Sequence, residues 1–206
     1  MRPSFCQDSL SPTSRRPSQL PLLNFTWSDL AEDVENKRCR RETMIEAFRE
    51  LEDLVSKLRP DADPYQETCG RREAFWRTLI ADRDYHWRGP PTAEWDFSGR
   101  FEAWMCKRDD SAGHEAYTRP FSDAAIVHCL YRSFIVTERG YLGLGRDSTQ
   151  SGDVVCVLRG GNVPFILRKK GDGYYELVGE AYVHGIMDGN FVMKSRKEDL
   201  KEFRIR

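Results

Sequence analysis

RSFIVTERGYLGLG, residues 132–145, marks the point at which the sequence changes from helical to strand character. β-branched and aromatic residues arrive here in short runs separated by glycine, which is the pattern of strands joined by tight turns. We expect strands at 132–137 and 141–144, with a turn at 138–140 between them.

Two further hairpins follow along the chain. The turn 159–162 joins the expected strands 154–158 and 163–169. The turn 171–173 then leads into a returning strand at 174–184, and a last strand is expected at 203–205. Hairpins joined by short turns pair antiparallel, and closure of the sheet removes exposed edges. Residues 131–206 are therefore predicted to form a small, antiparallel, barrel-like β module.

The preceding residues, 27–130, have helical periodicity. Apolar residues recur at steps of three and four, the spacing that places them on one face of a helix. The expected helices are 37–59, 71–81, 97–108 and 122–130, the last with Ser122 as its N-cap. The fold class predicted from the sequence is α+β, with the helical half packed on the β module so that 27–206 form one folded unit.

The first 26 residues have a different composition. Four prolines stand among serines and arginines, and few apolar side chains are available to offset the chain entropy lost on folding. We expect residues 1–26 to be a disordered tail. Asp8 and the prolines argue against an amphipathic targeting helix in this segment.

Composition excludes several classes of function. The 32 basic and 33 acidic side chains leave a net charge of -1, so a nucleic-acid partner is not expected. No run approaches the roughly 20 apolar residues that span a bilayer, so no membrane span is expected. The six cysteines form no CxxC pair, and the N-terminus has no signal-peptide pattern. We expect reduced thiols in an intracellular, cytoplasmic protein.

An ordered series of motifs resembles a known family. The motifs are AFWRTL (74–79), FIVTERGYLGLG (134–145), GDVVCVL (152–158), GGNVPFILR (160–168) and LVGEAYVHGIMDG (177–189). Together they resemble the C-terminal region of fungal heterokaryon-incompatibility (HET) domain proteins, over roughly residues 70–190. The resemblance implies a role in fungal incompatibility or an allied stress response. The HET domain itself is expected to be missing, because residues 1–60 are too few for an α/β domain of that kind.

The glycines of the opening stretch superficially resemble a phosphate-binding loop. A dinucleotide fingerprint must open a helix, so that backbone amides point at the anion. Here a polar loop follows Gly145. We interpret Gly140, Gly143 and Gly145 as turn and close-packing positions.

Cys156, His184 and Asp153 are candidates for a nucleophile, a base and an orienting group, since a thiol-dependent enzyme needs all three within hydrogen-bond reach. Cys156 lies in the apolar run 154–158, where a cysteine is usually a small buried hydrophobe. Asp153 follows a glycine at a strand entry, where a short carboxylate accepts turn amides. The structural interpretation is favoured, and the thiol enzyme stays as the alternative.

Glu180, His184 and Asp188 are candidates for a metal site, because carboxylates and an imidazole are common metal ligands. Even spacing in a strand places Glu180 and His184 on one face, whereas Asp188 follows in a turn. The favoured interpretation is that Glu180 pairs with an arginine such as Arg168 and that His184 caps the strand end. A metal-binding protein is the second alternative.

The sequence thus predicts a non-catalytic recognition or scaffold module with no cofactor and a protein partner. Loops on a rigid scaffold usually carry binding residues. The expected contact surfaces are the loops 85–91 and 182–189, and the candidate binding residues are Tyr85, Trp87, Glu180, Tyr182, His184 and Asp188.

Overall fold

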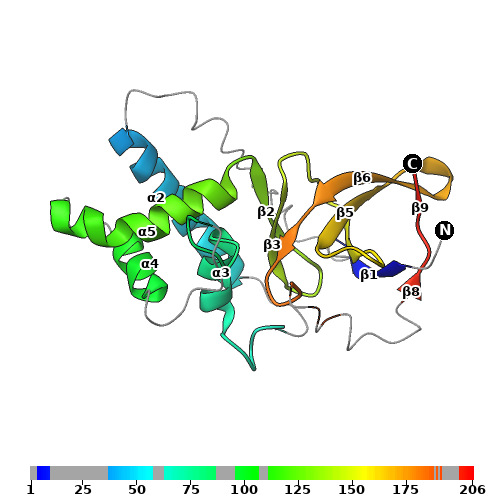
Figure 1. Ribbon diagram of the computed structural model, residues 1–206, viewed down its shortest axis with the longest axis horizontal. Coiled ribbons are helices and arrows are strands. Elements are labelled where there is room, and N and C mark those ends of the chain that lie inside the picture. The colour runs from blue at the N-terminus through cyan, green and yellow to red at the C-terminus, as the bar shows by residue number, and fades with distance from the viewer. Residues whose placement is uncertain are drawn as a thin grey trace.

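Helices gather at one end of the molecule and strands at the other (Figure 1). The computed structural model describes residues 4–9, 37–57, 63–86, 96–106, 111–187, 189, 191 and 200–206. The predicted α+β class is confirmed, with α-helices preceding most of the strands along the chain.

Three of the four helices of the described residues follow the predicted apolar pattern closely. The four helices are α2 (Lys37–Lys57), α3 (Arg71–Leu79), α4 (Phe97–Cys106) and α5 (Ala112–Cys129). In α2 the predicted inner face is buried at Met44, Ile45, Phe48 and Val55. The predicted faces of α3 and α4 are buried as well, so the spacing of three and four identified these helices correctly.

Helix α5 begins ten residues before the predicted start at Ser122. Its N-cap is Ser111, whose Oγ accepts a hydrogen bond from the backbone N–H of His114 at 3.2 Å. Pro120 lies inside the helix, although proline removes one backbone donor there. Burial of Phe121, Ala124 and Ala125 holds this segment in the core, so tertiary packing overrides the proline.

Most strands of the described residues lie near the predicted positions. The strands are β1 (Ser4–Ser9), β2 (Arg132–Val136), β3 (Leu142–Arg146), β4 (Val154–Val157), β5 (Pro164–Lys169), β6 (Tyr174–Glu180), β7 (Tyr182–Val183), β8 (Leu200–Lys201) and β9 (Arg204–Ile205). Strand β1 is a departure, because Ser4–Ser9 fall in the segment predicted to be disordered and pair antiparallel with β4. The other residues of the predicted tail lie outside the described residues.

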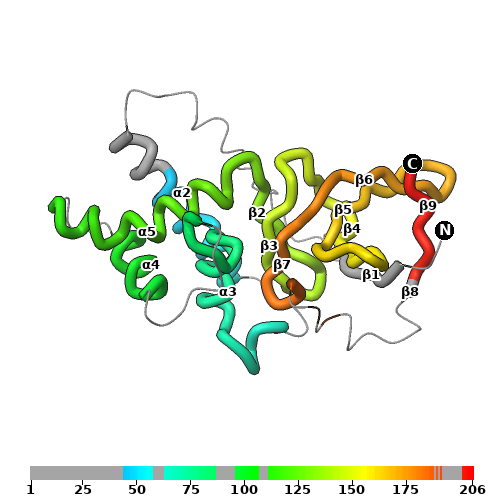
Figure 2. Tube along the Cα trace, in the orientation of Figure 1, coloured from blue at the N-terminus to red at the C-terminus, as the bar shows by residue number. Residues whose placement is uncertain are grey.

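Two sheets build the β module. One has six strands in the order β8-β1-β4-β5-β6-β9, and the other is β2-β3-β7. Figure 2 shows β2, β3 and β7 between the helices and the larger sheet. The predicted strand 174–184 is interrupted at Ala181, so that β6 belongs to one sheet and β7 to the other. The β6–β9 pair is parallel, an exception to the predicted antiparallel pattern.

The main apolar core joins the helices to the smaller sheet. Leu142 and Leu144 of β3 and Tyr182 of β7 belong to the same buried cluster as the apolar faces of the four helices. The rings of Phe75 in α3 and Phe134 in β2 have their centroids 5.7 Å apart. The helices and the smaller sheet therefore contribute side chains to one shared apolar core.

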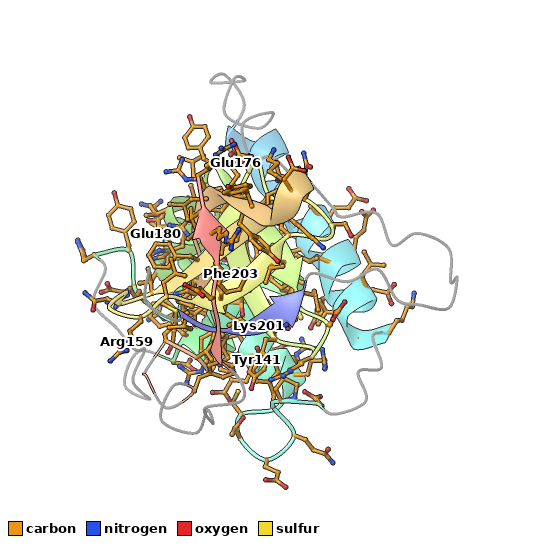
Figure 3. All side chains as sticks on the ribbon, turned by 90° about the vertical axis from the view of Figure 1, so that its right-hand side faces the viewer. Tyr141, Arg159, Glu176, Glu180, Lys201 and Phe203 are labelled. Carbon is orange, nitrogen blue, oxygen red and sulfur yellow. The ribbon has the colours of Figure 1, made fainter. Side chains whose placement is uncertain are left out.

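Smaller clusters lie within the β module. One contains Ile135 of β2, Ile166 of β5 and Val183 of β7, and therefore connects the two sheets. Another contains Cys156, Leu167 and Phe203. Figure 3 views the sheet end of the molecule, where Phe203 lies near the centre. Among the described residues, no helix has both the length and the apolar character to cross a membrane.

The glycines of 140–145 serve the backbone, as predicted. Gly140 has a φ of 84°, a left-handed conformation that suits glycine in the turn between β2 and β3. A Cβ at Gly143 would stand 2.4 Å from the carbonyl oxygen of Tyr182, and one at Gly145 would stand 2.6 Å from Cδ1 of Ile166. Gly143 thus allows β7 to pair with β3 directly beside His184.

Candidate functional site: a thiol, an imidazole and two phenols

A cysteine and a histidine meet where the helical part contacts β7. Cys69 lies at the end of the turn before α3, and His184 follows the last residue of β7. Nε2 of His184 is 3.7 Å from Sγ of Cys69, and Nδ1 is 2.8 Å from the hydroxyl of Tyr182. Both ring nitrogens of His184 therefore have a partner. We call Tyr65, Cys69, Tyr182 and His184 the joint cluster.

Tyr65 completes the joint cluster from the helical side. Its hydroxyl accepts a hydrogen bond from the backbone N–H of Leu142 at 2.8 Å and donates one to the carbonyl oxygen of His184 at 3.1 Å. Its ring is buried, and its centroid lies 5.6 Å from that of His184. One hydroxyl thus ties the turn before α3 to β3 and to the end of β7.

Burial keeps the joint cluster uncharged at neutral pH. It raises the pKa of the Cys69 thiol and lowers the pKa of the His184 imidazole. The pKa values of the phenols of Tyr65 and Tyr182 are also raised, mainly by burial. A low-dielectric surrounding disfavours the charged form of every such group. These shifts favour a thiol beside a neutral imidazole over a thiolate–imidazolium pair.

An ionic network lies beside the joint cluster. Nε of Arg77 is 2.8 Å from Glu73, and Nη1 is 2.6 Å from Asp82. The guanidinium also lies over the ring of Trp76, 4.8 Å from its centroid. After burial, the largest influences on the pKa of His184 are Asp82, which raises it, and Arg77, which lowers it.

Cys156, Asp153 and His184 do not form the triad that was considered as an enzyme site. Cys156 is buried with Leu167 and Phe203, as the structural interpretation predicted. Asp153 accepts from Nε and Nη2 of Arg168, both at 2.8 Å, and from the backbone N–H of Gln150. The carboxylate thus stabilises a turn and an ion pair.

Glu180 does not form the predicted pair with Arg168, because that guanidinium bonds to Asp153 and to the carbonyl oxygen of Ser148. Glu180 is exposed at the end of β6 (Figure 3). The interruption at Ala181 breaks the even spacing that would place Glu180 and His184 on one face. Asp188 lies outside the described residues, among which no group of three or more His, Cys, Asp or Glu side chains could hold a metal ion.

The other candidate binding residues fall into two groups. Tyr85 is 50% exposed and makes an edge-on ring contact with His86, whereas Trp87 lies outside the described residues. Tyr182 and His184 are buried or half-buried in the joint cluster. Of the loop 182–189, Gly185 and Gly189 are exposed.

Sequence reasoning missed Tyr65 and Cys69. They precede His184 by 119 and 115 residues, and no local spacing connects them to it. The signal that was available is the alternation Tyr182–His184, which puts a phenol beside an imidazole on one strand face. Cys69 could be identified as the thiol partner of His184 only from the packing of α3 on the smaller sheet.

Four cysteines whose side-chain exposure the structure describes, Cys69, Cys106, Cys129 and Cys156, should react with a neutral alkylating reagent in order of exposure. At pH 7 we expect exposed Cys106 to react first and half-buried Cys69 more slowly. Buried Cys129 and Cys156 should react only after unfolding. Peptide mapping by mass spectrometry after timed labelling measures this order. Reaction of Cys69 ahead of Cys106 would contradict the uncharged state derived above.

Comparison with known proteins agrees with the resemblance seen in the sequence. Residues 103–202 match the family described as the Het-6 beta-barrel domain. The chain is 30% identical to heterokaryon incompatibility protein 6, OR allele, of Neurospora crassa, in an alignment 185 residues long that covers 74% of this chain. The match spans 27% of that protein, about a quarter. No solved structure matches. The predicted relationship to fungal heterokaryon-incompatibility proteins is confirmed.

Proposed function

We propose that this relative of the fungal heterokaryon-incompatibility proteins is a non-catalytic recognition or scaffold module that binds another protein. The relationship supports fungal incompatibility as the proposed biological setting. The proposal that the module binds a protein and catalyses no reaction rests on the state of the thiol and the imidazole in the joint cluster.

The observation that carries the proposal is the state of the joint cluster. A cysteine nucleophile requires a thiolate, produced by a nearby cation or a helix N-terminus. Burial instead raises the pKa of Cys69 and lowers that of His184, whose other ring nitrogen bonds to the Tyr182 phenol rather than to a carboxylate. These groups hold α3 against β3 and β7, which favours a structural role over catalysis.

The proposed contact surface is formed by the exposed part of two neighbouring loops. Asp82 influences the pKa values of Tyr182 and His184, so the segment leading to Tyr85 lies near the end of β7. Tyr85 is the large apolar side chain that this segment exposes. Exposed tyrosines are frequent centres of protein interfaces, because they bury a large area at a small entropic cost. We place the protein in the cytoplasm, where its free thiols stay reduced.

Affinity capture from a Neurospora crassa lysate tests the proposal, with the tagged chain as bait. Replacing Tyr85 with alanine should weaken capture of the specific partner on the order of tenfold or more, as expected for the truncation of a central interface tyrosine. Replacing Cys69 with serine should leave capture unchanged, because the proposal assigns no chemistry to the thiol.

Leu177→Ala is the matched control, since Leu177 is 48% exposed but lies on β6 of the larger sheet. Equal capture by wild type and Tyr85→Ala, or a loss in Leu177→Ala alone, would refute the proposed surface. Loss of capture by a folded Cys69→Ser variant, together with turnover of the captured protein by the wild type, would favour the thiol enzyme.

A further inference from the structure

His184 is the point where three segments distant in the sequence meet through polar contacts. Its backbone N–H donates to the carbonyl oxygen of Leu142 at 2.9 Å, and its own carbonyl oxygen accepts from Tyr65. Its ring contacts Tyr182 and Cys69. The turn before α3, strand β3 and the end of β7 thus depend on one residue.

The two ring contacts fit a neutral imidazole. In that form one nitrogen donates and the other accepts, which matches a hydroxyl on one side and a thiol on the other. A protonated ring donates from both nitrogens. The hydroxyl of Tyr182 or the thiol of Cys69 must then turn its own proton away, and a positive charge enters a largely buried site.

From these contacts we infer that His184 is a pH-responsive joint: a proton taken up by its ring loosens the contact between the turn before α3 and strands β3 and β7. The helical core and the larger sheet keep their structure while this contact opens. The inference concerns regulation and does not depend on the identity of a binding partner.

The groups that face His184 come from every described element packed against it. They are Tyr65 and Cys69 from the turn before α3, Glu73 and Arg77 from α3, Asp82 from the segment after α3, and Tyr182 from β7. Arg77 bonds to both acidic groups, so the network carries one negative charge in excess. This charge favours protonation, but burial outweighs it.

The direction of the pH effect follows from linkage. The pKa of His184 in the folded chain lies below the ordinary value of 6.5, so the opened joint binds a proton more readily than the closed one. The stabilising effect of the neutral ring is complete above pH 6.5. It is lost progressively as the pH falls from 6.5 to the pKa of the closed form.

Hydrogen exchange of the Leu142 amide measures the opening, because this amide donates to the hydroxyl of Tyr65. Its protection factor should fall up to about tenfold per pH unit below 6.5. Amides in α4 and α5 should keep their protection over the same range. In His184→Gln the pH dependence at Leu142 should disappear, because an amide side chain does not titrate.

Two charge variants give a second, independent readout by NMR titration of the imidazole. Arg77→Gln removes a nearby cation and should raise the pKa of His184, whereas Asp82→Asn removes an anion and should lower it. Asn tolerates the left-handed conformation of Asp82, whose φ is 54°, so this variant is expected to fold. Buried His128 is the internal control, because neither group is among the influences on its pKa.

Three results would overturn the inference. One is a His184 pKa at or above 6.5 in the folded chain. Another is a fall of protection at Leu142 that persists unchanged in His184→Gln. The third is loss of protection in α4 and α5 in parallel with Leu142, since this would indicate global unfolding rather than a local joint.

Discussion

Replacing Phe75 with alanine is expected to lower the free energy of unfolding by about 3–5 kcal/mol, the range found when a large buried ring is truncated. Phe75 is 1% exposed, and its ring contacts Phe101 of α4 and Phe134 of β2. The substitution removes apolar area and leaves a cavity where helices and sheet meet. Because both halves line this cavity, we expect helical and sheet signals to be lost in one transition at lower urea.

Urea denaturation, followed by circular dichroism and by hydrogen exchange of β3 and β5 amides, measures both the loss of stability and whether helices and sheet unfold in one transition. Ile126→Ala is the matched control, since Ile126 lies on α5 but is 45% exposed, and should change stability by no more than about 0.5 kcal/mol. A Phe75→Ala chain in which the helices melt first and β5 stays protected would contradict a single folded unit.

The second large effect is expected at Asp153. Its carboxylate is 3% exposed and bonds to two nitrogens of Arg168 and to the N–H of Gln150. Asp153→Ala should lower the free energy of unfolding by about 3 kcal/mol, because it leaves a partly buried guanidinium and a turn amide without their partner. Thermal unfolding checks this value.

Glu176→Ala is the control for Asp153→Ala. Glu176 pairs with Lys170 at 2.6 Å, but both side chains are 51% exposed, and an ion pair in water contributes little. We expect no measurable change in the melting temperature. Equal destabilisation by the two variants would show that burial does not distinguish these ion pairs.

Local patterns in the sequence predicted most of the fold. The faces of α2, α3 and α4 follow from apolar spacing, and the turns at 138–140 and 171–173 follow from glycine. The start of α5 was missed because Pro120 argues against a helix locally, while burial of Phe121 decides in its favour. The pairing of β1 with β4 joins segments about 150 residues apart, which no local pattern encodes.

The candidate site was predictable only in part. Tyr182 and His184 were predicted as binding residues of the loop 182–189, but the thiol near His184 is Cys69 rather than Cys156. Likewise Arg168 pairs with Asp153 rather than with Glu180. In both cases the sequence indicated the kinds of residue that pair, a thiol with an imidazole and a carboxylate with a guanidinium. The packing of α3 and of the neighbouring strands decides which residues meet.

The central claim is that Cys69 and His184 form an uncharged structural contact rather than a catalytic pair. The pH dependence of alkylation at Cys69, followed on its own peptide by mass spectrometry, tests this claim most directly, and the urea-unfolded chain supplies the reference. We predict a midpoint above that of the unfolded chain, because burial raises the pKa of the thiol. A folded-state midpoint below neutral pH would reveal a thiolate and contradict the claim.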